Sequence, residues 1–149
     1  MSDHDEPPPT TATVLISNRQ RAVVDEAAFA GLARATLAGE GLADVELSVS
    51  FVDEAEIEDL HVRYMDEPGP TDVLSFPLDD MDERGTRLLG DVVIAPAVAA
   101  RNNPTDPESE LRLLLVHGIL HLLGYDHEED AEKAEMWLRQ ERYSGVRAP

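Results

Sequence analysis

The segment from Leu111 to Leu123 constrains the fold of this chain more than any other. Apart from Arg112 and two histidines, its residues are nearly all apolar. Asp106 and Pro107 precede it as a helix start, so the segment is typical of a helix that is buried on all sides. Gly124 is the natural end of this helix, because glycine accepts the left-handed backbone that a helix end requires. The sequence therefore predicts a central helix against which the rest of the chain packs.

Two of the five histidines, His117 and His121, lie four residues apart in this segment, and a third, His127, follows Gly124. Residues four apart share one face of a helix, so the two imidazoles can bind the same ion. A turn at Gly124 would bring His127 to that ion from outside the helix. We therefore predict a metal site formed by His117, His121 and His127 that holds one Zn²⁺ ion.

The three histidines also have other interpretations. A histidine on an apolar helix is commonly a structural core residue, but burying three imidazoles without partners costs free energy. A structural zinc site is usually closed by four protein ligands, often cysteines, and the chain has no cysteine. Metzincin metalloproteases share the spacing H-x-x-x-H-x-x-G-x-x-H, but a glutamate general base follows their first histidine, whereas Gly118 stands here. A metzincin-like metalloprotease and a structural-metal protein without catalysis stay as alternatives.

The pattern of the whole chain predicts an α+β fold in a single domain, with a mixed sheet of about four strands and helices mainly on one face. Residues 1–11 are expected to be a disordered tail, 12–143 the hydrolase domain and 144–149 a C-terminal tail. The second strand shows the clearest alternation of apolar and polar residues. The expected strands are Thr13–Ser17, Val45–Phe51, Thr71–Pro77 and Leu88–Ala95.

Aspartates predict where three of the helices begin. Asp25, Asp53 and Asp106 are expected N-caps, because their short carboxylates can accept hydrogen bonds from the first turn. The last helix is expected to start at Asp126 or His127. A helical turn is expected at 96–101. The acidic segment Leu78–Arg87 is interpreted as a loop that joins the third and fourth strands in a long hairpin.

The charge balance limits the partners of the chain. Twelve Lys+Arg against 31 Asp+Glu give a formal net charge of −19, which repels nucleic acid and anionic membranes at long range. A nucleic-acid substrate would need local positive charge, from the metal or from arginines such as Arg19, Arg21 and Arg63 gathered in a cleft. Otherwise a partner would deliver it. Without a signal sequence, an apolar span or a cysteine, a cytoplasmic protein is expected, with no membrane or DNA partner.

Three motifs stand in order along the chain: P-T-D-V-L-S-F-P at Pro70–Pro77, G-D-V-V-I at Gly90–Ile94 and H-G-I-L-H-L-L-G-Y-D-H at His117–His127. Together they resemble the YbeY family of metal-dependent endoribonucleases, which is implicated in ribosomal RNA maturation. The resemblance covers nearly the whole folded chain and implies an α+β domain with a mixed four-stranded sheet. It also implies that His117, His121 and His127 are the zinc ligands. One position departs from the family pattern: Met65 stands where the family usually has an arginine thought to serve activity, and Arg63 lies two residues earlier on another helical face. If no positive cleft exists, the ribosome or a protein partner would deliver the RNA substrate. The structural-metal alternative would then be a ribosome-associated protein without catalysis.

The metal site and the resemblance predict a zinc-dependent endoribonuclease that hydrolyses single-stranded RNA in ribosomal RNA maturation and ribosome quality control. Zinc would make hydroxide available at neutral pH and offset negative charge on the phosphoryl group. Ser75 and Asp72 are expected to line the site if the third strand ends near His117. Asp126 is expected either to orient a ligand histidine or to cap the last helix. No catalytic residue other than the metal ligands is assigned.

Overall fold

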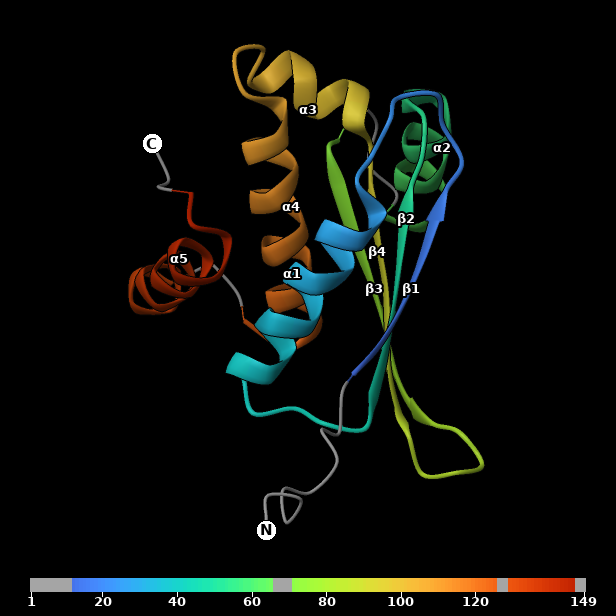
Figure 1. The fold of residues 1–149 in the computed structure, drawn as a ribbon, viewed down its shortest axis with the longest axis vertical. Helices are drawn as coiled ribbons and strands as arrows, with labels where there is room; N and C mark the ends of the chain where they lie inside the picture. Colours follow the sequence, from blue (N-terminus) through green and yellow to red (C-terminus); the bar gives the residue numbers. More distant parts are fainter. Residues whose placement is uncertain (1–11, 66–70, 126–128, 147–149) are drawn as a thin grey trace, which may run out of the picture.

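The structure is a computed structural model that describes residues 12–65, 71–125 and 129–146 (Figure 1). The expected tail at 1–11, and with it residues 147–149, Asp126 and His127, lie outside the described residues. Within the described ranges no helix has both the length and the hydrophobicity needed to cross a membrane. The strands are β1 (Thr13–Asn18), β2 (Val45–Phe51), β3 (Val73–Met81) and β4 (Arg87–Ile94). The helices are α1 (Glu26–Gly39), α2 (Glu54–Met65), α3 (Pro96–Asn102), α4 (Pro107–Leu122) and α5 (Asp130–Ser144).

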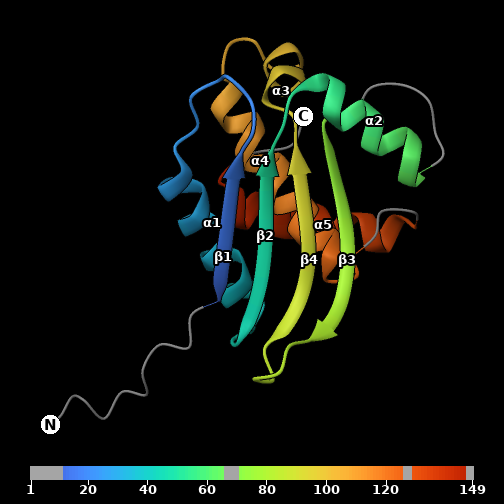
Figure 2. The ribbon, with the colours of Figure 1, turned by 90° about the vertical axis from the view of Figure 1, so that its right-hand side faces the viewer.

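The four strands form one mixed sheet in the order β1-β2-β4-β3. β1 pairs with β2, and β2 with β4, in parallel, whereas β3 is antiparallel to β4 and forms an edge of the sheet. Figure 2 shows the four strands side by side with α1, α4 and α5 behind them. The predicted α+β class and the mixed four-stranded sheet are therefore confirmed.

The hairpin between β3 and β4 is confirmed, but the prediction of a loop over Leu78–Arg87 is wrong. β3 continues to Met81 and β4 already begins at Arg87, with Met81 paired to Arg87. Asp82 closes the short turn, because its carboxylate accepts hydrogen bonds from the backbone N–H groups of Arg84 and Thr86. An acidic residue is compatible with a strand here, since the side chain of Asp80 is exposed while its residue pairs with Leu88 along the ladder.

The two faces of the sheet carry different layers. α1 and α4 cover one face, over a core that includes Leu47, Val92 and Ile119. α2 lies against the other face (Figure 1), where Ile57 packs with Val93 in a smaller cluster. Most helices thus lie on one face, as predicted, because alternate residues of each strand point to opposite sides.

The predicted N-caps are present at all three positions. The carboxylates of Asp25, Asp53 and Asp106 accept hydrogen bonds from backbone N–H groups of the first turns of α1, α2 and α4. The start predicted for the last helix is wrong, because Glu129 has an extended backbone (φ −105°, ψ 150°) and α5 begins only at Asp130. The helix predicted at 96–101 is present as α3.

α4 is the central helix, as the apolar segment predicts. It contacts β3, β4, α1, α3 and α5, and its residues Leu115, Val116, Ile119 and Leu120 have no exposed surface. It is not covered all round, however. Leu113, His117 and His121 are spaced four residues apart and are all only partly buried. The two histidines therefore lie on the one side of α4 that reaches solvent.

Candidate metal centre

His117 and His121 lie close together on one face of α4. Their ring centroids are 4.5 Å apart and the ring planes meet at 78°. Zinc binds imidazole nitrogen at about 2.0–2.1 Å, so two rings at this separation can offer one nitrogen each to the same ion. The predicted relationship between these two residues is therefore present in the structure.

Gln140 of α5 fixes the orientation of His117. Its Oε1 atom lies 2.5 Å from Nδ1 of His117, and its side chain is buried, with 3% exposed. Because an amide oxygen can only accept a hydrogen bond, Nδ1 of His117 carries a proton, and in the neutral ring Nε2 is then the nitrogen with the lone pair. A neutral imidazole held in one tautomer by a neighbouring acceptor is the form in which histidine binds metal ions.

Gly118, next to the first histidine, is pressed against the sheet. A Cβ atom at this position would lie 2.7 Å from Cγ1 of Val92 and 3.3 Å from Oγ of Ser75. The Ser75 hydroxyl also donates a 2.9 Å hydrogen bond to the carbonyl oxygen of Gly118. α4 thus approaches β3 and β4 at a residue without a side chain, and a glutamate at position 118 would point into the sheet and not toward the two histidines.

A hollow of about 330 Å³ opens over the two histidines on the side of β3. Ser75 lines it, as predicted, because alternate residues of β3 face α4. Asp72 lines a neighbouring hollow that also contains His117, and its carboxylate accepts a hydrogen bond from Asn102. The residues of the first hollow are Val73, Leu74, Ser75, Pro77, His117 and His121.

The donor set fits a zinc ion as far as the described residues extend. His117 and His121 supply two imidazoles, one in a fixed tautomer, beside an accessible hollow. The third predicted ligand, His127, lies outside the described residues. Within those residues, no group of three histidine, cysteine, aspartate or glutamate side chains could hold a metal ion. The assignment of His117, His121 and His127 to one zinc ion therefore stays a prediction.

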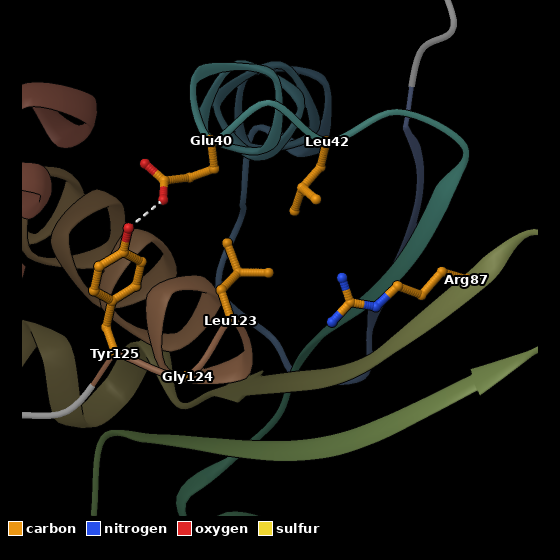
Figure 3. Close-up of a pocket in the computed structure, with 6 residues that line it drawn as sticks. All are labelled: Glu40, Leu42, Arg87, Leu123, Gly124 and Tyr125. Atoms are coloured by element: carbon orange, nitrogen blue, oxygen red, sulfur yellow. Dashed lines mark hydrogen bonds between the residues drawn. The ribbon is translucent and has the colours of Figure 1, made fainter.

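Glu40 holds the segment that leads out of α4. Figure 3 shows the hydrogen bond, 2.6 Å long, that the Tyr125 hydroxyl donates to the Glu40 carboxylate. Tyr143 and Arg139 of α5 donate to the same carboxylate, whose side chain is 7% exposed. Burial raises the pKa of Glu40, but these hydrogen bonds and the charge of Arg139 outweigh it, so the pKa lies below its ordinary value. The end of α1 is thereby tied both to α5 and to the residue two positions before His127.

Tyr125 is affected by the same contact. Burial, followed by the hydrogen bond to Glu40, raises the pKa of Tyr125 to about 12. The phenol therefore keeps its proton, which it donates to Glu40. This contact and the left-handed backbone of Gly124 (φ 100°) define the path of the chain just after α4, where the turn at Gly124 was predicted.

The arginines suggested for a positive cleft do not gather around the two histidines. Arg19 is paired with Glu56, and Arg63 with Asp59 one turn away on α2. Among the described residues, none of the arginines of the chain lines either hollow that contains His117. Arg19 and Arg21 instead line a separate hollow near α3. The three arginines therefore do not form one cleft: Arg19 and Arg63 are paired with carboxylates, and Arg21 lies in the hollow near α3, away from the two histidines.

Some residues of this site were not predicted. Gln140 has no motif around it, although it lies four residues after Met136, on the same buried face of α5. That spacing is the only sequence signal of its burial. Trp137 and Lys133 were not predicted as residues of the site either, but both line the hollow next to His117.

Comparisons with known proteins agree with the motifs. Residues 15–145 match the family model described as Endoribonuclease YbeY. Curated proteins of that name are similar over most of the chain. One from Beutenbergia cavernae is 50% identical over 137 residues, covering 85% of this chain and 91% of the relative. One from Streptomyces coelicolor is 47% identical over 135 residues, covering 82% of each chain.

A solved structure shares the fold. The solution structure of TM1509 from Thermotoga maritima superposes with a TM-score of 0.57 at 32% sequence identity, covering 89% of this chain and 87% of the other. Residues 15–145, which the family model matches, contain the two histidines of α4, Ser75 and Gln140. Both the family match and the curated relatives confirm the resemblance seen in the sequence: this chain belongs to the Endoribonuclease YbeY family of RNA-cleaving enzymes.

Proposed function

We propose that this chain is a zinc-dependent endoribonuclease that hydrolyses phosphodiester bonds of single-stranded RNA in the cytoplasm, in ribosomal RNA maturation and ribosome quality control. The observation that carries the proposal is the pair His117 and His121, whose rings lie 4.5 Å apart beside an accessible hollow. The family name of the relatives supports RNA as the substrate. The assignment of the metal to zinc rests on the donor set, since imidazoles without cysteine suit a catalytic zinc site.

His117, His121 and His127 would hold the ion. When bound, zinc would act as a Lewis acid on the phosphodiester and on the attacking water. The protein supplies the geometry: Gln140 keeps the proton of His117 on Nδ1, and the Ser75 hydroxyl ties α4 to β3 at Gly118. Because Gln140 is buried, the imidazole of His117 is oriented before any substrate binds.

The protease alternative is disfavoured by Gly118. Proteases with this histidine spacing use a glutamate after the first histidine as general base. At position 118 even a Cβ atom would come within 2.7 Å of Val92. The structural-metal alternative is disfavoured by the accessible hollow over the two histidines, since structural zinc sites are usually closed.

The test compares wild-type protein with His117→Ala on single-stranded RNA, with the zinc content of the same samples measured. Wild type should cleave, should lose activity in a chelator and should regain it with zinc, whereas His117→Ala should be inactive. His61→Ala on α2 is the matched control, because His61 lines neither hollow, and it should behave as wild type. Equal cleavage by wild type and His117→Ala would mean that the activity comes from a contaminant.

The cellular role needs a separate test. In cells that lack this chain, precursors of ribosomal RNA should accumulate. Wild type should restore processing and His117→Ala should not. Normal ribosomal RNA in such cells would contradict the proposed role without contradicting the nuclease chemistry.

A further inference from the structure

A second hollow adjoins the histidine pair on the side of α5. It measures about 420 Å³ and shares His117 and Val73 with the hollow over the two histidines. Pockets of this size with mostly apolar walls are typical of sites for small molecules. Its walls come from β3, α4 and α5, and its residues are Asp72, Val73, Leu113, Leu114, His117, Lys133, Trp137 and Gln140.

Trp137 forms the aromatic wall of this hollow. It is partly buried, and its ring centroid lies 6.2 Å from that of His117, with the planes at 81°. A flat group held against Trp137 is therefore next to the histidine pair. Aromatic side chains bind the bases of single-stranded nucleic acids in this way, largely without regard to sequence.

Lys133 supplies positive charge at the same place. Its Nζ atom lies 5.6 Å from the centre of the Trp137 ring. Lys133 is the single lysine of the chain, and within the described part of the chain it forms no ion pair, whereas Arg19, Arg63 and Arg101 are each paired with a carboxylate. In a protein with a net charge of −19, this ammonium group is the cation best placed to attract a phosphate near His117.

We propose that this hollow binds one nucleobase of the RNA substrate against Trp137, with the ammonium group of Lys133 on a phosphate of the same nucleotide. The inference rests on the proposed nuclease function, because the position beside His117 gives the hollow its role. It would bind the nucleotide next to the cleaved bond and so determine how single-stranded RNA lies across the histidine pair. The hollow explains how an acidic protein holds RNA at one point without a broad basic surface.

Binding can be measured without metal or catalysis. Trp137 is the single tryptophan of the chain, so tryptophan fluorescence, excited at a wavelength that tyrosine does not absorb, reports on this hollow alone. Adenosine 5′-monophosphate, titrated into the full-length protein with a chelator present, should quench the fluorescence in a saturable manner. Ribose 5-phosphate, which has no base, should not. Lys133→Gln should weaken binding of the monophosphate about two- to fivefold, the range of an exposed ion pair, and should leave binding of adenosine unchanged.

The contribution to catalysis is measured separately. Trp137→Leu should raise the KM for single-stranded RNA about 5- to 150-fold, the range that base–aromatic stacking gives, with little change in kcat. Trp137→Phe, which keeps a flat ring, should restore most of the affinity. Leu138→Ala is the matched control, since Leu138 is on the same helix, is 66% exposed and does not line the hollow; its KM should equal that of wild type.

The outcomes separate the two proposals. If adenosine 5′-monophosphate does not quench the fluorescence and Trp137→Leu has an unchanged KM, the nucleobase site is overturned. This result would not contradict the proposed nuclease function. Saturable quenching by a protein that cleaves no RNA would support the site and contradict the proposed function. If Trp137→Leu unfolds, the nucleobase site is tested instead with Lys133→Gln, because that variant keeps the tryptophan. Its affinity for adenosine 5′-monophosphate is then compared with its affinity for adenosine. Equal weakening of both ligands in Lys133→Gln would contradict the assigned phosphate contact.

Discussion

Oε1 of Gln140 lies 2.5 Å from Nδ1 of His117, although the two residues belong to different helices and are 23 positions apart. This contact makes α5 part of the candidate metal centre. Gln140→Leu removes the acceptor while keeping a side chain of similar size. It should lower zinc affinity about 10- to 100-fold, as loss of such supporting contacts typically does.

The effect on His117 can be observed in the metal-free protein. ¹⁵N NMR of the imidazoles should show the proton of His117 on Nδ1 in wild type and a shift of the population toward Nε2–H in Gln140→Leu. Gln140→Glu, which keeps an acceptor, should retain the Nδ1–H form. An identical tautomer population in wild type and Gln140→Leu would mean that Gln140 does not orient the ring.

Gly118 should tolerate no larger residue. Gly118→Ala should destabilise the protein by about 1–3 kcal/mol, because the added methyl group would lie 2.7 Å from Val92 and overpack the contact between α4 and the sheet. Thermal unfolding measures this change. Gly31→Ala is the matched control: Gly31 also lies within a helix, but a Cβ atom there meets nothing within 4 Å, so the change should stabilise by about 0.5–1 kcal/mol. Equal effects at the two positions would contradict the close approach at Gly118.

The Glu40 carboxylate should make stability depend on pH. Its pKa is lowered in the folded protein from an ordinary value of 4.5, so its ionised form stabilises the fold above that value. The contribution is lost as the pH falls through the lowered folded pKa. Glu40→Gln should therefore be less stable than wild type at about pH 7, by roughly 2–3 kcal/mol, and the difference should shrink toward about pH 3. Urea unfolding of wild type and Glu40→Gln at several pH values in this range measures the difference in stability. A difference that does not change with pH would argue against a role of the Glu40 charge.

Two tyrosines that donate to Glu40 should differ in their effect on the metal. Tyr125→Phe and Tyr143→Phe each remove one hydroxyl from the same carboxylate, so each should cost about 1.5–3 kcal/mol of stability. Tyr125 is two residues before His127, whereas Tyr143 is at the end of α5. Only Tyr125→Phe should lower zinc affinity, measured by competition with a chromogenic chelator. A similar loss of affinity in both variants would show that Tyr125 acts through overall stability alone.

Local chemistry made much of this fold predictable. The carboxylates of Asp25, Asp53 and Asp106 cap their helices within three residues, and the alternation in β2 depends only on neighbouring residues. The spacing of His117 and His121 likewise determines that they share a face. These features need no knowledge of distant contacts, so the sequence alone reveals them.

Features that depend on distant contacts were missed. The acidity of residues 78–87 suggested a loop, yet pairing with β4 makes part of it a strand. The partners of Arg19 and Gln140 lie 37 and 23 residues away, and nothing in the local sequence specifies them. Such pairings are set by how the helices pack on the sheet, which periodicity does not encode.

The burial of α4 also bears on the order in which this protein matures. Leu115, Val116, Ile119 and Leu120 are fully enclosed by neighbouring elements, and this apolar packing, not ligation, provides the main driving force for folding. Small zinc modules need their metal to fold at all. Here the polypeptide should fold to its native structure in zinc-free medium, so that in the cell the protein can fold first and bind the ion afterwards.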